Sequence, residues 1–439
     1  MGVGPGKLWS LLAMAGLLVS SARGQQIQRL DRERAETMLE NVSSDVRKYY
    51  YDAKLHGLDW DALVRETKLN IAKAPDAAVA DAEIAALVER LNDSHTIFIP
   101  PRNVNTVDYG WQFKVVGNHC FVTEVSPKSD ADNKGMRPGD ELLTINGFIV
   151  DRVSAPKLKY AMSVLLPRTR LQVELRDPAG KLLQLTVDAS IKKHSTVAGL
   201  GGSSWYSNQQ IIDREEAWLK ARAQYKELGT ELMIIRIPEF LQTGSDVDNL
   251  FKKAQAHKTL IVDLRGTPGG RVDSVQSYLG GVFSHDLKVG DFVQRSKTSP
   301  IAVKSNRKDA FNGDLIVLVD SETASGGELF ARAVQLEERG TILGDHTSGQ
   351  TMESQLFAHS TGVNPVYTYG DSVTVADAVM SDGKSLEHIG VEPDRIFLPT
   401  AADIAAGRDP VLAFAATLAG VTLSPEDAAK LFPSGSSNE

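Results

Sequence analysis

A serine stands at the point where an apolar strand is expected to give way to a helix. The strand is Leu315–Val319, and Ser325 follows it with Gly326 and Gly327 directly behind. A serine with Glu328 three residues later is the pattern of a helix capping box. The same position suits a nucleophile, because the positive end of a helix dipole favours a developing oxyanion. On these residues alone the capping role is the preferred interpretation.

A second glycine-rich junction follows the strand-like run Thr259–Leu264. Its Gly269 and Gly270 allow a close backbone approach and can direct N–H groups at an anion. The junction lacks the Gly-Lys-Ser/Thr sequence of a phosphate-binding loop, so nucleotide binding is not expected. By itself it is typical of an ordinary crossover turn between a strand and a helix.

The surrounding pattern predicts the elements that must position both turns. From residue 231 onward, short apolar runs alternate with helical stretches, which favours an α/β domain. Residues 27–95 have helical periodicity, with a helix expected to begin near Asp76, and the stretch between these two regions contains short strand patterns separated by turns. The runs are 232–237, 259–264, 315–319 and 341–344 in the α/β domain, and 121–125, 141–145, 169–176 and 181–188 in the middle region.

These patterns divide the chain into six predicted segments. They are a signal peptide at 1–24, a helical domain at 25–98, a β-rich module at 105–190, a connecting segment at 191–230 with a polar helix over 213–228, an α/β core at 231–400, and a C-terminal helix with a disordered tail at 401–439. The apolar run Leu8–Val19 is too short to span a bilayer, and Ala22 and Gly24 precede a plausible cut before Gln25. The mature protein is therefore expected to be periplasmic or secreted, with no membrane attachment after cleavage.

The composition excludes several classes of protein. Of the 439 residues, 42% are hydrophobic and 24% are charged, so the chain is neither disordered nor a polytopic membrane protein. Lys and Arg number 48 against 56 Asp and Glu, a net charge of −8, which argues against a nucleic-acid partner. The single cysteine, Cys120, excludes an intramolecular disulfide and a Cys-based zinc cluster, and neither a metal nor a cofactor is expected.

With both glycine-rich turns in this order, the sequence resembles the family that unites C-terminal processing (tail-specific) peptidases with the tricorn core protease and interphotoreceptor retinoid-binding protein. The run Gly135–Gly147 resembles the PDZ signature that such peptidases carry. The resemblance covers about residues 75–400. It implies a crotonase/ClpP-like α/β core, an N-terminal helical domain, a PDZ-like module and a serine peptidase acting on peptides or proteins, and it leaves a homo-oligomer open.

The family has two catalytic solutions. In the C-terminal processing branch a lysine about 25 residues after the serine acts as the base, but Gln350 stands there and the next lysine is Lys384. The tricorn-like branch uses a Ser-His pair that ends a helix, which Ser94 and His95 match. It also uses a glutamate just before a Gly-Val-x-Pro-Asp segment, which Glu387 matches. The resemblance therefore implies the Ser/His/Glu solution.

The implied roles follow the chemistry of a serine nucleophile. Ser325 attacks the acyl carbon, and His95 takes the hydroxyl proton as general base. Glu387 orients and stabilises the imidazolium, together with Ser94. The implied oxyanion donors are the N–H of Gly326 and one from Gly269 or Gly270.

The PDZ-like module is implied to bind an extended C-terminal peptide at a sheet edge, although a purely structural module stays open. The run in the position of its carboxylate-binding loop is Tyr109, Gly110, Trp111, Gln112 and Phe113. Two non-enzymatic functions also stay open, a binder of peptides or apolar ligands like the retinoid-binding relatives and a catalytically dead PDZ scaffold. His388 and His346 are the competing histidines, the first expected at the surface or behind Glu387 and the second near the serine.

Overall fold

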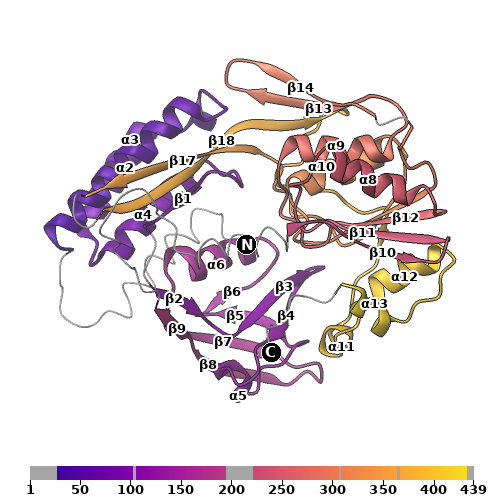
Figure 1. Ribbon diagram of the computed structural model, residues 1–439. Helices are drawn as coiled ribbons and strands as arrows, with labels where there is room; N and C mark the ends of the chain where they lie inside the picture. The colour runs from indigo at the N-terminus through magenta and orange to yellow at the C-terminus, as the bar shows by residue number, and fades with distance from the viewer. Residues whose placement is uncertain (1–26, 102–104, 194–220, 306–307, 363–365, 433–439) are drawn as a thin grey trace, which may run out of the picture.

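The computed structural model describes residues 27–101, 105–193, 221–305, 308–362 and 366–432. A helical domain, a β-rich module and an α/β core surround the middle of the molecule, and one long hairpin runs from the helices to the core (Figure 1). The predicted signal peptide at 1–24 and the end of the predicted tail lie outside the described residues. No helix of the described ranges is both long enough and apolar enough to cross a bilayer.

The helical domain consists of α2 (Arg29–Tyr49), α3 (Trp60–Lys73) and α4 (Ala77–Glu89). The side chain of Asp76 accepts a hydrogen bond from the N–H of Val79, so α4 begins where the sequence predicts a helix start. The three helices bury a common core that also includes Phe98, which follows the domain in the chain. This packing holds the segment after α4, which carries Ser94 and His95, against the helices.

The β-rich module is an antiparallel sheet in the order β3-β4-β5-β7-β8, with β6 paired to β5. All four strand runs expected here are present, with small shifts at their ends. The strands are β3 (Trp111–Val116), β4 (His119–Val125), β5 (Glu141–Ile145), β6 (Phe148–Ile149), β7 (Arg170–Arg176) and β8 (Leu182–Asp188), with the helices α5 (Asp130–Asn133) and α6 (Ser154–Tyr160). A two-stranded ribbon, β2 (Asn105–Asp108) with β9 (Ser190–Lys193), closes the module at its base. Strand β3 is therefore an edge of the sheet.

The α/β core is built on a six-stranded sheet in the order β10-β11-β12-β15-β16-β19. Strands β10 and β11 are antiparallel and the remaining pairs are parallel, so the predicted mixed α/β fold is confirmed. The strands are β10 (Gln224–Leu228), β11 (Leu232–Arg236), β12 (Thr259–Asp263), β15 (Asp314–Val319), β16 (Thr341–Gly344) and β19 (Arg395–Ile396). Because successive side chains of a strand point to opposite faces, each face of this sheet packs its own helices. One face packs α8 (Ser245–Ala254), α9 (Val272–Val282) and α10 (Gly326–Leu336), and the other packs α12 (Pro410–Leu418) and α13 (Pro425–Leu431).

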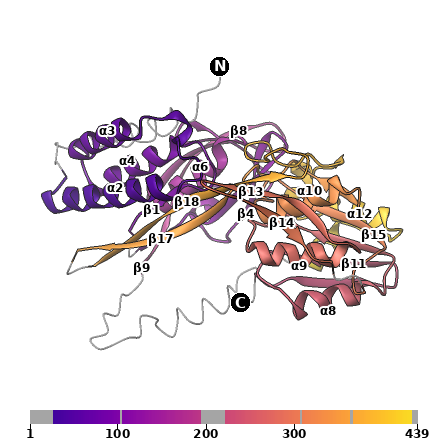
Figure 2. The ribbon, with the colours of Figure 1, turned by 90° about the horizontal axis from the view of Figure 1, so that it is seen from above.

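A second sheet joins the helical domain to the core, and the sequence did not predict it. Its path is β1-β18-β13-β14, with β17 paired to β18. The strands are β1 (Ile97–Ile99), β13 (Leu287–Gln294), β14 (Thr298–Val303), β17 (Glu353–Thr361) and β18 (Tyr367–Met380). Both ribbon views show the β17/β18 hairpin beside α2 at one end and β13 near the core at the other (Figure 2). Strand β18 thus belongs to both halves of the molecule.

Two local expectations need correction. The polar helix expected over 213–228 is not formed at its end, where residues 224–228 are strand β10, paired with β11 along its whole length. Residues 213–220 lie outside the described residues. After residue 400 the structure has three short helices where one is expected, because α11 (Ala401–Ala405) precedes α12 and α13.

Candidate functional site

Ser325 lies at the N-terminus of α10 in a backbone conformation that serine rarely adopts. Its φ of 50° and ψ of −115° place it in a strained region for a residue with a side chain. The chain leaves the buried strand β15 and must reverse sharply into the helix, and this turn presents the serine. Its side chain faces the second glycine-rich turn, since a Cβ added to Gly269 would lie only 3.0 Å from Ser325 Oγ.

The buried side chain of Glu328 fixes the turn that presents Ser325. Its side chain is fully buried, and its carboxylate accepts the N–H of Ser325 at 3.1 Å, the reciprocal half of the predicted capping box. It also accepts hydrogen bonds from Thr347 Oγ1 (2.6 Å) and from the N–H groups of Gly349 (2.7 Å) and Gln350 (2.9 Å). Burial raises the pKa of Glu328 to about 7 against the effect of these four donors. One carboxylate thus fixes the serine turn and the loop that faces it.

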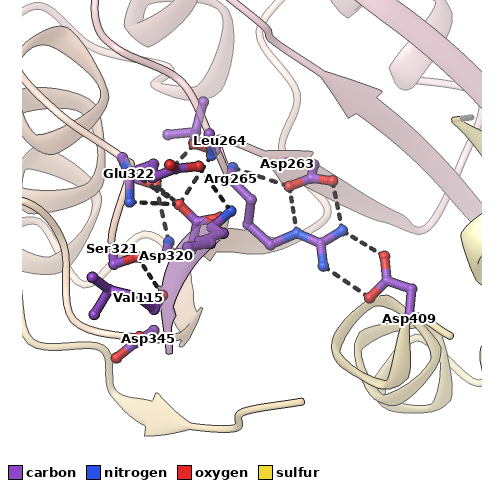
Figure 3. A network of polar contacts seen from close by, with 12 residues as sticks. Val115, Asp263, Leu264, Arg265, Asp320, Ser321, Glu322, Asp345 and Asp409 are labelled. Carbon is purple, nitrogen blue, oxygen red and sulfur yellow. Dashed lines mark hydrogen bonds and ion pairs between the residues drawn. The ribbon is translucent and has the colours of Figure 1, made fainter. Parts of the chain in front are cut away.

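The two glycine-rich turns are bonded directly to each other. The N–H of Ala324 donates to the carbonyl of Thr267 at 2.9 Å, and Gly266 N–H donates to Asp320 Oδ1 at 3.0 Å. Figure 3 shows that Arg265 continues this network, because its guanidinium bridges Asp263 and Asp409 with distances of 2.8 Å. A continuous network of hydrogen bonds and ion pairs therefore joins the two turns at the carboxyl ends of β12 and β15.

Two of the three predicted oxyanion donors, Gly326 and Gly269, lie beside Ser325. Gly326 is the first residue of α10, so its N–H has no acceptor within the helix. Gly269 and Gly270 have φ values of 119° and 136°, and a side chain at Gly269 would lie 2.6 Å from Ser325 Cβ. Only glycine permits this approach of the two turns. Gly269 and Gly326 thus lie beside the Ser325 side chain, whereas a Cβ at Gly270 would meet backbone atoms of Phe240.

The second half of the site is a relay of three side chains. Ser94 Oγ lies 2.7 Å from His95 Nδ1 and donates to Glu387 Oε2 at 3.0 Å. Glu387 also accepts the N–H of Ser94 at 2.7 Å and the N–H of Thr351 at 3.1 Å. Since the Ser94 proton goes to Glu387, Ser94 Oγ accepts the proton of His95 Nδ1. This tautomer leaves the lone pair of His95 Nε2 free.

The two halves meet through the loop after β16. Ser325 N–H donates to the carbonyl of Gln350 at 2.7 Å, and the next residue, Thr351, donates to Glu387. Within the described residues, no hydrogen bond joins His95 directly to Ser325. Such catalytic hydrogen bonds are often long before substrate binds. Gln350, which occupies the lysine position of the other branch, thus lies beside the serine but offers no base.

Burial sets the electrostatics of the relay. The pKa of His95 is lowered by burial, and the carboxylate of Asp93 opposes this shift. The pKa of Glu387 is raised, again by burial, against the hydrogen bonds from Thr351 and Ser94. A histidine whose pKa lies below the usual 6.5 is neutral at pH 7, which is the form that can accept a proton.

The two competing histidines, His388 and His346, each lie within hydrogen-bond distance of a backbone carbonyl. His388 Nε2 lies 2.7 Å from the carbonyl of Asn92 and 3.7 Å from Glu387 Oε1, with a side chain that is 53% exposed. His346 Nδ1 lies 3.0 Å from the carbonyl of Thr347. Neither has the link to Glu387 through a hydroxyl group that His95 has.

The residues predicted for peptide binding are only partly in a loop. Trp111 and Phe113 are buried in the module core, and Gln112 between them is exposed on β3. Only Tyr109 and Gly110 precede the strand, the latter with a φ of 71°. The alternation of a strand explains the correction, because an aromatic residue at every second position fills one face of the sheet.

The β-rich module contacts the serine turn directly. The hydroxyl of Ser321 donates to the carbonyl of Val115 on β3 at 2.6 Å. Lys159 of α6 lies 2.6 Å from Glu322, and Lys114 of β3 pairs with Asp320. Strand β3 therefore lies next to residues that precede Ser325 by five or fewer positions.

Sequence reasoning missed two residues of the site, Asp93 and Thr351, and recognised Glu328 only as part of a capping box. Asp93 accepts the N–H groups of His95 (2.9 Å) and Thr96 (2.7 Å), so it shapes the turn that presents the histidine. The bonds of Glu328 to Thr347, Gly349 and Gln350 were not foreseen either. An Asp that precedes a Ser-His pair at a helix end is a recognisable turn signal. Nothing local in the sequence reveals the contact of Thr351 with Glu387.

Comparison with known proteins identifies the core. The model of peptidase family S41 matches residues 231–397, which contain both glycine-rich turns and Glu387. Residues 231–397 of this chain thus match peptidase family S41. The family assignment made from the sequence is thus confirmed.

Curated S41 relatives come from both branches of the family. The chain is 24% identical over 371 residues to the chloroplastic carboxyl-terminal-processing peptidase 3 of Arabidopsis thaliana, covering 80% of this chain and 66% of that protein. It is 23% identical over 429 residues to tricorn protease homolog 1 of Streptomyces coelicolor, covering 90% of this chain and 36% of that protein. It is 31% identical over 299 residues to the tail-specific protease of Haemophilus influenzae, covering 64% and 39%. The chain therefore spans between about a third and two thirds of the length of these relatives.

Solved structures share the S41 fold at low sequence identity. The crystal structure of mature CPAF has a TM-score of 0.62 at 14% identity, covering 86% of this chain and 94% of that one. The photosystem II D1 C-terminal processing protease has a TM-score of 0.50 at 18% identity, covering 91% and 98%. At these identities the likeness concerns the fold alone.

Proposed function

We propose that this chain is a serine peptidase that hydrolyses peptide bonds through an acyl-enzyme. One observation carries the proposal. Ser325 sits at a strained helix N-terminus against Gly269, and its loop partner Thr351 bonds to Glu387, which reaches His95 through Ser94. A nucleophile, a base and a group that orients the base are thus on one connected path.

The chemistry follows from the free lone pair of His95. Ser325 Oγ attacks the carbonyl carbon while His95 Nε2 takes the hydroxyl proton, and the negative oxygen forms beside the N–H of Gly326 and of Gly269 or Gly270. The imidazolium is stabilised through Ser94 by Glu387. It then gives its proton to the leaving amine, and water repeats the sequence on the ester to release the acid.

The finer architecture belongs to the same proposal. We infer a crotonase/ClpP-like core for the six-stranded sheet and a PDZ-type module for β3–β8. The open edge of β3 beside α6 supports the second inference, since a peptide could add to it as a further strand. Its substrate would be the C-terminus of a peptide or protein. Export is proposed on the apolar run Leu8–Val19, and a mature chain that begins at Gln25 is the testable sign of it.

A fluorophosphonate probe tests the catalytic proposal. The parent chain is expected to be labelled at Ser325, with labelling lost in Ser325→Ala and reduced at least 100-fold in His95→Ala. His388→Gln is the matched control, since this imidazole is beside Glu387 but bonds to the carbonyl of Asn92. It should be labelled like the parent.

The opposite result has an equally definite meaning. A folded parent chain that is not labelled, and that hydrolyses no peptide, would contradict the proposal. Ser325 would then be a helix cap, and the chain would be a binder of peptides or apolar ligands. Labelling of the parent with equal labelling of His95→Ala would contradict the role of His95 alone.

A further inference from the structure

A second cluster of ionisable side chains lies where α2 meets the β17/β18 hairpin. Asp45 comes from α2, His359 from β17 and Asp371 from β18. His359 Nε2 lies 2.8 Å from Asp45 Oδ2 and 3.2 Å from Asp371 Oδ1. The three potential ligand atoms all lie within 4.8 Å of one another. A helix from the N-terminal region and the two strands of one hairpin thus direct their polar atoms at one point.

Asp371 is the carboxylate of this cluster whose oxygens have no hydrogen-bond partner. Its side chain is 0% exposed, yet neither of its oxygens accepts a hydrogen bond. The His359 Nε2 proton is directed to Asp45, so it does not serve Asp371 as well. Across the described ranges, no Lys or Arg lies within ion-pair distance of Asp45 or Asp371. A buried carboxylate without a partner is costly, and a cation is the usual remedy.

The imidazole of His359 is held in a fixed orientation. The ring of Tyr369 stacks on it with a centroid distance of 5.3 Å and an interplanar angle of 29°. The hydroxyl of Tyr369 in turn accepts a hydrogen bond from Asn41 Nδ2 of α2 at 2.6 Å. The side chains of His359 and Asp45 are 21% and 14% exposed, so the cluster has an open side. Fixed ligands and an open side are what an entering ion needs.

We propose that Asp45, His359 and Asp371 bind one divalent transition-metal ion of the Zn²⁺ type. One imidazole nitrogen with two carboxylate oxygens suits Zn²⁺ and its neighbours in the first transition row, whereas Mg²⁺ and Ca²⁺ prefer oxygen ligands alone. Two carboxylates and a neutral imidazole carry a charge of −2, which the ion balances. A water molecule would complete the four ligands.

The ion would act as a clamp between the helical domain and the hairpin. Strand β1 pairs with β18 so that Phe98 is opposite Asp371, and His95 lies three residues before Phe98. The site is independent of the proposed peptidase activity, because none of its ligands belongs to the path from Ser325 to His95. Its test therefore uses binding and stability, measured in the Ser325→Ala background.

A bound proton is the competing explanation. Burial, together with the charge of Asp45, raises the pKa of Asp371 to about 8, so this carboxyl could be neutral without any metal. The two explanations differ in what added metal does. A protonated Asp371 predicts no stoichiometric binding, whereas the proposed site predicts one ion per chain.

The test titrates CoCl₂ and ZnCl₂ into the purified chain after it has been stripped with a chelator. We expect one Co²⁺ per chain with visible absorption bands of a four-coordinate site, displacement by Zn²⁺, and a midpoint of thermal unfolding that rises with Zn²⁺ concentration. Asp45→Asn and His359→Gln should weaken binding at least tenfold. His119→Gln is the matched control, because His119 lies 2.5 Å from Glu141 on an exposed surface and should change nothing.

Asp371→Asn keeps the inference testable if other variants unfold. It removes the buried charge, so the metal-free variant should unfold at the same or a higher temperature than the metal-free parent, and added Zn²⁺ should no longer stabilise it. Absence of stoichiometric binding in the parent overturns the inference. Equal binding by the parent and by His359→Gln overturns it too, since the ion would then occupy another part of the surface.

Discussion

The two halves of the candidate site are held by different kinds of contact. Glu328 fixes Ser325 through partners that lie between 3 and 22 positions away in the chain, all within the α/β core. His95 is fixed through Ser94 and Glu387, which are 293 positions apart and in different regions of the molecule. The serine half is thus preformed by the core, whereas the histidine half depends on the docking of the helical domain.

Substitutions of Ser325 are expected to have the largest effect on catalysis. Ser325→Ala and Ser325→Gly should both lower kcat by about 10⁴-fold or more, because the nucleophile is lost. They should differ in stability, since glycine accepts a φ of 50° without strain. We expect Ser325→Gly to have a free energy of unfolding about 1 kcal/mol above that of Ser325→Ala. Equal denaturation midpoints would show that the turn is not strained.

In the histidine half of the site, removing the charge of Glu387 is expected to lower both activity and stability. Glu387→Gln should lower kcat by about 10²- to 10⁴-fold, because the imidazolium loses the charge that stabilises it. It should also cost about 1–3 kcal/mol of stability, since the N–H groups of Ser94 and Thr351 and the Ser94 hydroxyl all donate to this carboxylate. Steady-state kinetics and urea unfolding measure the two effects. A loss of activity without a loss of stability would contradict the docking role of Glu387.

Glu328→Gln tests the preformed half by its dependence on pH. The pKa of Glu328 is about 7 in the folded chain and 4.5 ordinarily, so the folded state binds the proton more tightly. The contribution of this group to stability is therefore full below pH 4.5 and is lost as the pH rises through 7. The difference in free energy of unfolding between the parent and Glu328→Gln should shift against the parent by about 3 kcal/mol between pH 4.5 and 7.5. A difference that is constant over this range would contradict the raised pKa.

The smallest expected effect is on the pH profile of catalysis. Since burial lowers the pKa of His95, the base stays neutral below the usual value of 6.5. The acidic limb of kcat/KM should therefore lie below pH 6.5, and Asp93→Asn should move it further down, because the Asp93 charge raises this pKa. A limb above pH 6.5, or an upward shift in Asp93→Asn, would contradict the assignment.

The contrast between local contacts in the serine half and long-range contacts in the histidine half explains how much the sequence could predict. The core strands β11, β12, β15 and β16 and the start of α4 are local patterns, and they were predicted closely, whereas β10 was expected to be helical and β19 was not predicted. The pairing of β18 with β1, β13 and β17 was not, because strand pairing between distant segments leaves no local signal. Ser94, His95 and Glu387 entered only through the family resemblance. The structure then supplied the path between them, including Thr351, which periodicity cannot reveal.

The distance along the chain between His95 and its carboxylate has a consequence for biosynthesis. Ser94 and Glu387 are 293 positions apart, and at about 5–20 residues per second roughly 15–60 s separate their emergence from the ribosome. The strand that docks the helical domain, β18, is also made late. A nascent chain therefore carries no assembled site until Glu387 has been made. A peptidase built in this way would acquire its activity only after β18 and Glu387 have left the ribosome and folded against the helical domain.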